Sequence, residues 1–318
     1  MTSARALWSV DVGTVEIRPG SLGDGLLVET LFSGISRGTE RLVFEGRVPA
    51  SEYERMRGPA MEGAFPFPVK YGYNVVGRIA EGPKTGHLVF ALHPHQTHFR
   101  LPEAALVPLP ESLPPDRAVL AANTETALTL LWDSGAAAGD RIAVIGAGVV
   151  GALVAYLAAQ LPGAEVTLVD LNAERSALAE TLGCQFSLPE NAPQECDVVF
   201  HLSASAAGLD TAIDCAGMEA TVVEGSWYGD AKISVALGGA FHSRRLRICS
   251  SQVGHIPPLR APRWSYGRRM AKALELLADP VLDTLISGET SFNELPDHYA
   301  RILSDPATLC HRIRYDAP

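Results

Sequence analysis

The clearest pattern of apolar and polar positions lies between residues 141 and 170. A short apolar run at 142–145 precedes three closely spaced glycines, and an apolar run with helical spacing then continues to residue 161. A second short run follows at 166–169 and ends at Asp170. Short β-branched runs bounded by turns predict buried strands, and the longer run predicts a helix. The region therefore predicts a strand, a glycine turn, a helix and a second strand.

The same residues also allow a membrane interpretation. Residues 142–161 contain no charged side chain, and a stretch of that length can cross a bilayer. However, the glycine spacing and the strand-like flanks favour an α/β unit over a membrane span. We therefore expect a protein without a membrane partner.

The remaining pattern predicts two kinds of structure. Residues 6–33 alternate between apolar and polar positions, which is typical of antiparallel strands, and residues 47–68 form an irregular segment rich in proline, glycine and charge. Further strands are predicted at 69–81, 88–92, 100–110, 197–202, 220–225, 246–250, 282–292 and 311–315. Helices are predicted at 115–123, 125–134, 172–182, 206–215, 263–278 and 295–304.

This order predicts an α/β protein built from two domains. Strands that alternate with helices imply a parallel sheet with right-handed crossovers, so residues 121–251 are expected to form a Rossmann-type, doubly wound domain. Residues 1–120 form a β-rich domain in this interpretation, and residues 252–318 return to it.

Composition narrows the function. The chain has 318 residues, enough for two sizeable cores, and its net charge of −10 argues against a nucleic-acid partner, which would need a basic surface. The five cysteines are scattered, as expected of free thiols in a reducing compartment. The N-terminal residues show no apolar signal-peptide core, so we expect a cytoplasmic protein.

The glycine turn has the spacing of a dinucleotide-binding motif. Gly146 would permit the tight turn, Gly148 would let the backbone approach a pyrophosphate, and Gly151 would let the helix pack closely on the strand. The N–H groups of Val149 and Val150 would face the phosphates at the helix N-terminus. The alternative is a glycine turn that binds nothing.

The acid at the end of the second strand bears on the choice of nucleotide. Asp170 would accept hydrogen bonds from the ribose hydroxyls of the adenosine, and its charge would repel a 2′-phosphate. We therefore expect NAD, although Arg175, one helical turn further on, leaves NADP open.

Several motifs together resemble the medium-chain dehydrogenase/reductase superfamily of alcohol dehydrogenases and quinone reductases. They are SGISRGTE at 33–40, YGYNVVGRIAEG at 71–82, AGDRIAVIGAGVVG at 138–151, VTLVD at 166–170 and TVVEGSWYG at 221–229. The resemblance implies a GroES-like catalytic domain, a small-molecule substrate and a homodimer paired through an edge strand near 246–250. The first two motifs look most like the bacteriochlorophyllide dehydrogenases.

The resemblance also implies further cofactor contacts. Arg37 matches a position that reaches the pyrophosphate, and a guanidinium suits phosphate oxygens. Ser203, Ser226 and Trp227 follow predicted strands at the edge where ligands of open α/β sheets bind.

The chain departs from the zinc-dependent members of that superfamily. Ser36 replaces a cysteine ligand, and Tyr73 with Asn74 replaces a histidine–glutamate pair. Neutral hydroxyls are poor zinc ligands, and no cysteine occurs in residues 80–120, so we expect neither a catalytic nor a structural zinc. His93, His95 and His98 could instead hold a metal, but substrate contact is the preferred interpretation.

Without zinc, hydrogen-bond donors must stabilise charge on the substrate oxygen. The candidate catalytic residues are Ser36, Thr39, Tyr73 and His95, with His98 as a further candidate; each could equally be an ordinary packing or capping residue.

The leading hypothesis is an NAD(H)-dependent oxidoreductase that interconverts a secondary alcohol and a ketone. The alternatives are an NAD(P)H-dependent reductase of an activated C=C bond, as in a quinone or enone, and a protein that binds NAD(H) without turnover.

Overall fold

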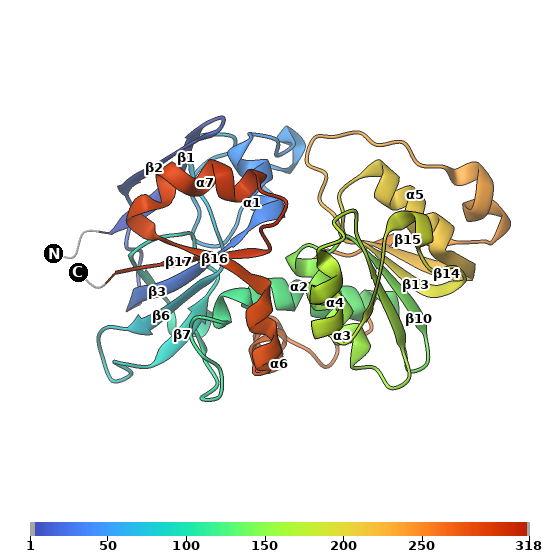
Figure 1. Cartoon of the computed structure of the whole chain (residues 1–318). Coiled ribbons are helices and arrows are strands. Elements are labelled where there is room, and N and C mark those ends of the chain that lie inside the picture. Colours follow the sequence, from blue (N-terminus) through green and yellow to red (C-terminus); the bar gives the residue numbers. More distant parts are fainter. Residues whose placement is uncertain (1–3, 317–318) are drawn as a thin grey trace. The chain divides into compact units, whose positions relative to one another are not determined.

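Two groups of residues pack separately in the computed structural model, which describes residues 4–316 (Figure 1). The first unit comprises Met1–Ala122 and Met270–Pro318, and the second comprises Asn123–Arg269. Residues 252–269 therefore pack with the second unit, whereas the sequence pattern places the return of the chain at residue 252.

The second unit is built on a parallel sheet of six strands in the order β12-β11-β10-β13-β14-β15. The strands are β10 (Arg141–Ile145), β11 (Glu165–Val169), β12 (Gln185–Ser187), β13 (Cys196–His201), β14 (Ala216–Glu224) and β15 (Arg247–Ser250). The chain order runs outward from β10 in both directions, so the Rossmann-type, doubly wound sheet is confirmed.

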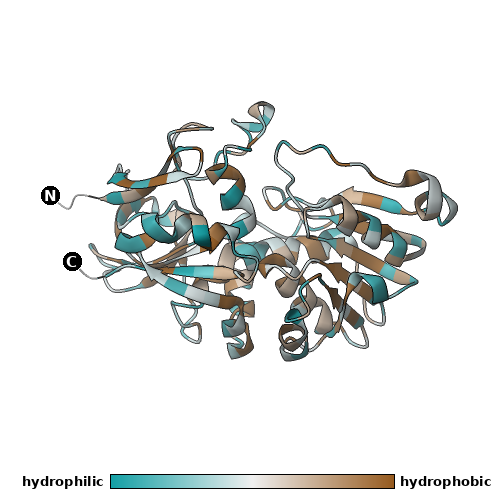
Figure 2. Cartoon of the chain, turned by 45° about the horizontal axis from the view of Figure 1, so that its top comes forward, coloured by the Kyte–Doolittle hydropathy of each residue, from teal (hydrophilic) through white to brown (hydrophobic). Residues whose placement is uncertain are grey.

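Helices cover both faces of this sheet. They are α3 (Val149–Ala159), α4 (Arg175–Thr181) and α5 (Ala206–Cys215), and a further helix, α2 (Ala121–Ser134), precedes the first strand of this sheet in the chain. Figure 1 shows α3 and α4 on one face and α5 on the other. Leu209 and Ile213 of α5 pack on Ile145, Val199 and Val222, and the strands are correspondingly apolar in Figure 2. Because β10, β11 and β13 are covered on both faces, all but one residue of each is buried, and they show apolar runs rather than alternation.

The first unit consists of two sheets with helices packed beside them. A four-stranded sheet has the order β2-β1-β5-β4, and a seven-stranded sheet has the order β16-β17-β3-β6-β7-β9, with β8 paired to β3. The bounds are β1 (Arg5–Asp11), β2 (Thr14–Pro19), β3 (Leu26–Ser36), β4 (Glu62–Gly63), β5 (Val69–Lys70), β6 (Val75–Ile79), β7 (Leu88–Ala91), β8 (His98–Leu101), β9 (Val107–Pro108), β16 (Ile286–Ser291) and β17 (Cys310–Arg314). The predicted β-rich domain is therefore present.

Three helices belong wholly or mainly to this unit: α1 (Arg37–Phe44), α6 (Tyr266–Leu276) and α7 (Leu295–Ser304). Helices α1 and α7 pack together, and Phe44 meets Tyr299 edge to face with the ring centroids 5.4 Å apart. Phe292 and Ile313 join the same apolar cluster, which therefore includes residues from both ends of the chain.

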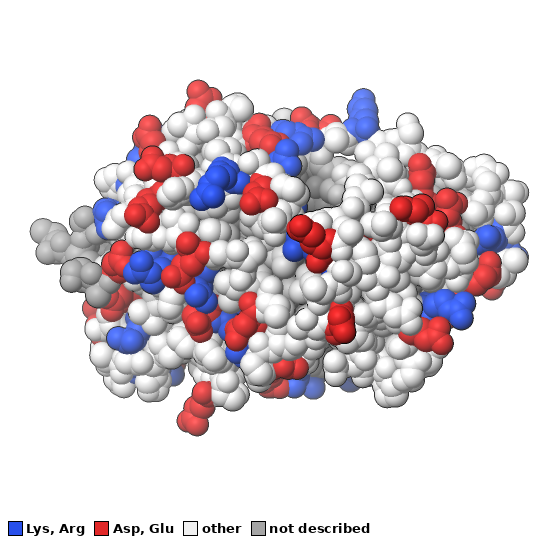
Figure 3. Space-filling model, in the orientation of Figure 1, with Lys and Arg blue, Asp and Glu red and all other residues white. Residues whose placement is uncertain are grey.

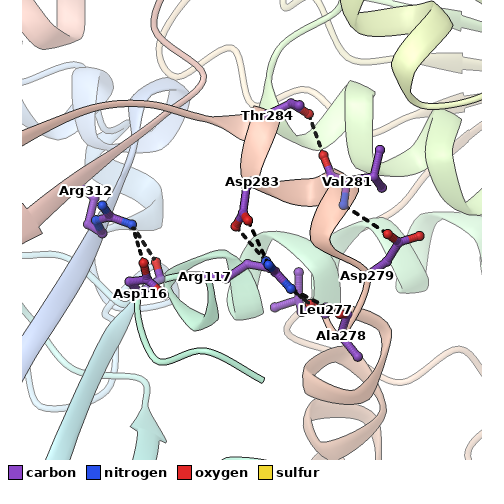
Figure 4. Close-up of polar contacts among 9 residues, drawn as sticks. All are labelled: Asp116, Arg117, Leu277, Ala278, Asp279, Val281, Asp283, Thr284 and Arg312. Carbon is purple, nitrogen blue, oxygen red and sulfur yellow. Dashed lines mark hydrogen bonds and ion pairs between the residues drawn. The ribbon is translucent and has the colours of Figure 1, made fainter. Parts of the chain in front are cut away.

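The return of the chain is anchored by a buried arginine (Figure 4). Arg117 donates to both carboxylate oxygens of Asp283, at 2.7 and 2.8 Å, and to the carbonyls of Leu277 and Ala278. Arg312 on β17 donates to Asp116, the neighbour of Arg117. These bonds join residues about 160 to 200 positions apart, so β16 and β17 complete the first unit.

Short helices account for the main local differences from the sequence pattern. The 3-10 turns are Ala50–Glu52, Glu103–Ala105, Ala118–Leu120, Pro189–Asn191, Pro280–Leu285 and Phe292–Glu294, and a wider turn spans Leu237–Phe241. The strand predicted at 282–292 is wrong over its first residues. Asp279 accepts a hydrogen bond from the N–H of Val281, and Pro280 lies in the first turn, so a helical turn precedes β16.

Within residues 4–316, no helix has both the length and the apolar character needed to cross a bilayer; the uncharged stretch at 142–161 contains β10, the glycine turn and α3. All five cysteines are free thiols. On the face shown in Figure 3, basic side chains are interspersed with acidic ones.

Candidate functional site

The glycine turn lies between β10 and α3 in the second unit. Gly146 has φ +108°, and a Cβ there would lie 2.8 Å from the N atom of Ser203. A Cβ on Gly151 would lie 1.8 Å from the carbonyl O of Gly146, so this glycine lets α3 start close to the end of β10. Gly148 differs, because a Cβ there would meet no atom within 4 Å. Protein packing thus requires Gly146 and Gly151, whereas Gly148 faces open space.

Asp170 ties this turn to the end of β11. One carboxylate oxygen accepts the N–H of Ala147 at 2.7 Å, and the other accepts the N–H of Asn172 at 2.8 Å. The Asp170 side chain is only half-buried. The carboxylate therefore holds the glycine turn while remaining accessible to a ligand.

The other predicted cofactor residues have different surroundings. Val149 and Val150 form the first turn of α3, where N–H groups have no acceptor within the helix. Arg175 begins α4 and is half-buried. Ser203 is exposed after β13, and Ser226 and Trp227 are half-buried after β14. These residues therefore all lie at the carboxyl ends of the parallel strands. Arg37 begins α1 in the first unit, and its predicted contact with a pyrophosphate stays a prediction.

In the first unit, one backbone N–H and two side chains contact the buried carboxylate of Glu40. One oxygen accepts the backbone N–H of Ser36 at 2.8 Å. The other accepts the hydroxyl of Tyr299 at 2.7 Å and lies 3.0 Å from Nε2 of His95. On its other side, His95 Nδ1 lies 2.8 Å from the hydroxyl of Ser33. We call Glu40, Ser33, Ser36, Tyr73, His95 and Tyr299 the Glu40 cluster.

His95 is enclosed by this cluster. Its side chain is 0% exposed, and both ring nitrogens have partners within the protein. A Cβ on Gly72 (φ +116°) would lie 2.8 Å from the imidazole, so only glycine allows this close approach. His95 can therefore orient its neighbours, and neither ring nitrogen is left without a protein partner.

Tyr73 joins the cluster through its hydroxyl. Burial, and then the charge of Glu40, raise the pKa of Tyr73 to about 12, while hydrogen bonds to Ser36 and Thr39 oppose the shift. The phenol consequently stays protonated at neutral pH. The structure thus brings the three predicted hydroxyls, those of Ser36, Thr39 and Tyr73, to one place.

The three histidines at 93–98 have separate environments. The ring of His93 stacks on Phe99 with the centroids 4.0 Å apart, and burial lowers the pKa of His93 to about 3. His95 faces Glu40, and Nδ1 of His98 is buried without a hydrogen-bond partner among the described residues. Within residues 4–316, no three His, Cys, Asp or Glu side chains are grouped in a way that could hold a metal.

Sequence reasoning missed Glu40, although it lies in the SGISRGTE motif. A local signal existed, because Ser36 occupies the N-cap position of α1, and an acid one turn later can reach back to the backbone of the cap. The structure shows that arrangement, with Glu40 rather than the Ser36 side chain making the capping bond. Tyr299 carried no such signal.

Comparisons with known proteins give matches among solved structures. No protein-family model matches the chain, and no curated protein matches it. The structure of 2R,3R-butanediol dehydrogenase from Bacillus subtilis is 16% identical with a TM-score of 0.78, covering 99% of this chain and 100% of that one. The alcohol dehydrogenase rspB of Escherichia coli CFT073, complexed with NADH, is 14% identical with a TM-score of 0.77 over the same shares.

TarJ of S. aureus, solved in complex with NADPH, is 13% identical with a TM-score of 0.75, again covering 99% of this chain and 100% of that one. At these identities the likeness establishes the fold. The α/β fold with a Rossmann-type sheet is thus shared, over 99% of this chain, with these solved structures.

Proposed function

We propose that this protein is an NAD(H)-dependent oxidoreductase of the medium-chain type that interconverts a secondary alcohol and a ketone without zinc. The observation that carries the proposal is the glycine turn, in which Gly148 faces open space beside the half-buried carboxylate of Asp170. The likeness to the butanediol dehydrogenase, whose named substrate carries secondary hydroxyls, supports the choice of reaction.

The residues of the second unit fit a dinucleotide. Gly148 leaves room for the pyrophosphate, and the N–H groups of Val149 and Val150 offer donors at a helix N-terminus. Asp170 would accept a ribose hydroxyl and would repel the 2′-phosphate of NADP, so NAD is the proposed cofactor. When bound, the nicotinamide supplies or accepts the hydride.

The residues of the first unit would handle the substrate oxygen. Tyr73 is a neutral donor whose raised pKa keeps its proton in place, and it can polarise a carbonyl through a hydrogen bond. Ser36 and Thr39 hydrogen-bond to Tyr73 and orient its hydroxyl. Glu40 and His95 act as positioning residues, because they are buried and bonded to the same cluster.

Zinc independence is supported by the chemistry of the donor set. Ser36 and Tyr73 are hydroxyls, and a phenol with a pKa of about 12 gives up its proton reluctantly to a metal. The nearby carboxylate of Glu40 already accepts three hydrogen bonds. The resemblance of 33–40 and 71–82 to bacteriochlorophyllide dehydrogenases favours a branch without zinc ligands.

Cofactor binding and turnover test the proposal separately. NADH fluorescence should change saturably on titration with the protein. The Kd obtained for NADH should be lower than the Kd for NADPH. A panel of secondary alcohols with NAD⁺ should then give turnover faster than enones or quinones give with NADH or NADPH. Absence of NADH binding would contradict the proposal; faster enone reduction would support the C=C reductase instead. Binding without any turnover would identify a non-catalytic NAD(H)-binding protein.

A further inference from the structure

A second group of polar side chains lies at the carboxyl ends of β13 and β14 in the second unit. His201 is the last residue of β13 and Glu224 the last residue of β14, and the parallel register places them opposite each other. Nδ1 of His201 lies 2.7 Å from Glu224 Oε2, and Nε2 lies 2.7 Å from the hydroxyl of Ser203. We call Ser203, His201 and Glu224 the serine relay.

The carboxylate of Glu224 is held in place by three donors. The backbone N–H of Ser226 donates to Oε1 at 2.8 Å, and the hydroxyl of Tyr228 and Nδ1 of His201 donate to Oε2. Burial alone would raise the pKa of Glu224, but the hydrogen bonds from His201 and Ser226 oppose it, and the pKa is lowered. An ionised carboxylate can only accept hydrogen bonds.

This arrangement determines the tautomer of His201. Because Glu224 only accepts, Nδ1 carries the proton and Nε2 is left as an acceptor for the Ser203 O–H. The hydroxyl of Ser205 lies 3.0 Å from that of Ser203, and it accepts the N–H of Gly208, so it can donate its own proton to Ser203. Each hydrogen bond from Ser203 through His201 to Glu224 then has its donor and its acceptor in the direction needed to withdraw the Ser203 proton.

Of the three side chains of the relay, the serine is the most exposed. The His201 side chain is 0% exposed and Glu224 is 16% exposed, whereas Ser203 is an exposed residue. Ser203 follows a strand and precedes α5, and its neighbour Ala204 has φ +52°, so the chain turns sharply there. A Cβ on Gly208 would lie 2.0 Å from the Ser203 hydroxyl, so this glycine makes room for it.

Backbone donors are available next to the serine. Helix α5 begins at Ala206, with Ser205 as its N-cap, and the N–H groups of Ala206 and Ala207 have no acceptor within the helix. Such N–H groups can stabilise negative charge that develops on a carbonyl oxygen.

We propose that Ser203 is an activated nucleophile that accepts the acyl group of small carboxylic esters. Ser203 Oγ attacks the carbonyl carbon while its proton passes to Nε2 of His201, and the bond to the leaving alcohol breaks as His201 returns that proton to the alkoxide. Water, deprotonated by His201, then attacks the acyl carbon; the bond to Ser203 Oγ breaks, His201 returns the proton to that oxygen, and the carboxylic acid is released. Ser203 is also one of the predicted cofactor contacts, so this acyl transfer takes place in the cofactor-free protein and NAD(H) competes with it; it does not require the proposed dehydrogenase function.

The test uses the full chain and two probes, a fluorophosphonate and p-nitrophenyl acetate. The fluorophosphonate should label one serine, which peptide mass mapping should identify as Ser203. The ester should release p-nitrophenol in an initial burst, followed by slower turnover. Ser203→Ala should abolish both signals, and Ser176→Ala, which removes an exposed serine on α4, should change neither.

Two further variants test the relay itself. Glu224→Gln should slow labelling about 10²–10⁴-fold, because the amide no longer holds the imidazole in the required tautomer. Tyr228→Phe removes one donor to Glu224 and should slow labelling less than Glu224→Gln does. It replaces Glu224→Gln in the test if that variant does not fold. Circular dichroism and thermal melting check the fold of each variant. The proposal is overturned if the native chain labels no faster than heat-denatured chain, if the label lies on another serine, or if folded relay variants label at the native rate.

Discussion

Replacing two glycines of the dinucleotide turn one at a time should separate packing from ligand binding. In Gly151→Ala, the new Cβ would lie 1.8 Å from the carbonyl O of Gly146, and real Cβ contacts essentially never fall below 3.0 Å. Helix α3 would therefore have to move by about 1.2 Å from the end of β10. Overpacking of this kind costs about 1–3 kcal/mol.

Helix propensity acts in the opposite direction at this position. Alanine in a helix interior is favoured over glycine by about 0.5–1 kcal/mol. The sign of the change in the free energy of unfolding therefore shows which of the two effects is larger. We expect Gly151→Ala to lower the free energy of unfolding and to lower the melting temperature by about 2–4 °C per kcal/mol.

Gly148→Ala is the matched control. Its φ of −72° and ψ of 178° suit alanine, and a Cβ there would meet no atom within 4 Å. We expect a change in unfolding free energy within about 0.5 kcal/mol, because the loss of a glycine N-cap and the reduced entropy of the unfolded chain oppose each other. The new methyl group would nevertheless crowd the pyrophosphate, and overpacking of this kind costs about 1–3 kcal/mol. NADH binding should therefore weaken about 5- to 150-fold.

Thermal unfolding and NADH titration of both variants provide the measurements. A stable Gly151→Ala variant would refute the packing argument. A Gly148→Ala variant that binds NADH as tightly as the native protein would refute the assignment of this turn to the cofactor.

Three further outcomes are expected. Asp170→Ser removes the charge that repels a 2′-phosphate, so the ratio of the Kd for NADP⁺ to the Kd for NAD⁺ should fall at least about tenfold. An unchanged ratio would contradict the role of this acid. The free energy of unfolding should fall as the pH is lowered from 6.5 to about 4. The pKa values of His93 (about 3) and His311 (about 4) lie below the ordinary 6.5, so the unfolded chain binds more protons than the folded chain in that window. The loss is up to about 1.4 kcal/mol per pH unit for each group. Denaturant titrations should show a smaller loss in His93→Phe, and an equal loss would exclude this histidine as a cause. Ile248→Lys on the edge strand β15 should convert the expected homodimer to a monomer in light scattering while NADH binding persists, and a native protein that is already monomeric would contradict the dimer.

The sequence predicted those features whose partners are close in the chain. β10, the glycine turn, α3 and β11 follow one another within thirty residues, so local periodicity and glycine spacing were sufficient to identify them. The position of Asp170 directly after β11 follows from the same pattern, whereas its hydrogen bonds to Ala147 and Asn172 appear only in the structure, and its contact with a ribose stays a prediction.

The polar clusters could not be predicted in the same way. Glu40 meets His95 and Tyr299, which are 55 and 259 residues away in the sequence, and no local pattern connects them. His201 ends an apolar run that predicts a strand, but its bond to Glu224 depends on the register between β13 and β14. Strand register and long-range contacts exist only in the folded protein, and they bring the polar side chains of these clusters together.

Turnover under metal-free conditions tests the central claim most directly. The native protein, dialysed against a chelator and shown by elemental analysis to lack zinc, is assayed for NADH formation from NAD⁺ and a panel of secondary alcohols, beside Tyr73→Phe. We predict turnover that added zinc does not increase and that Tyr73→Phe lowers at least about 100-fold with NADH binding unchanged. Turnover that appears only when zinc is added, or that Tyr73→Phe leaves intact, would contradict the account.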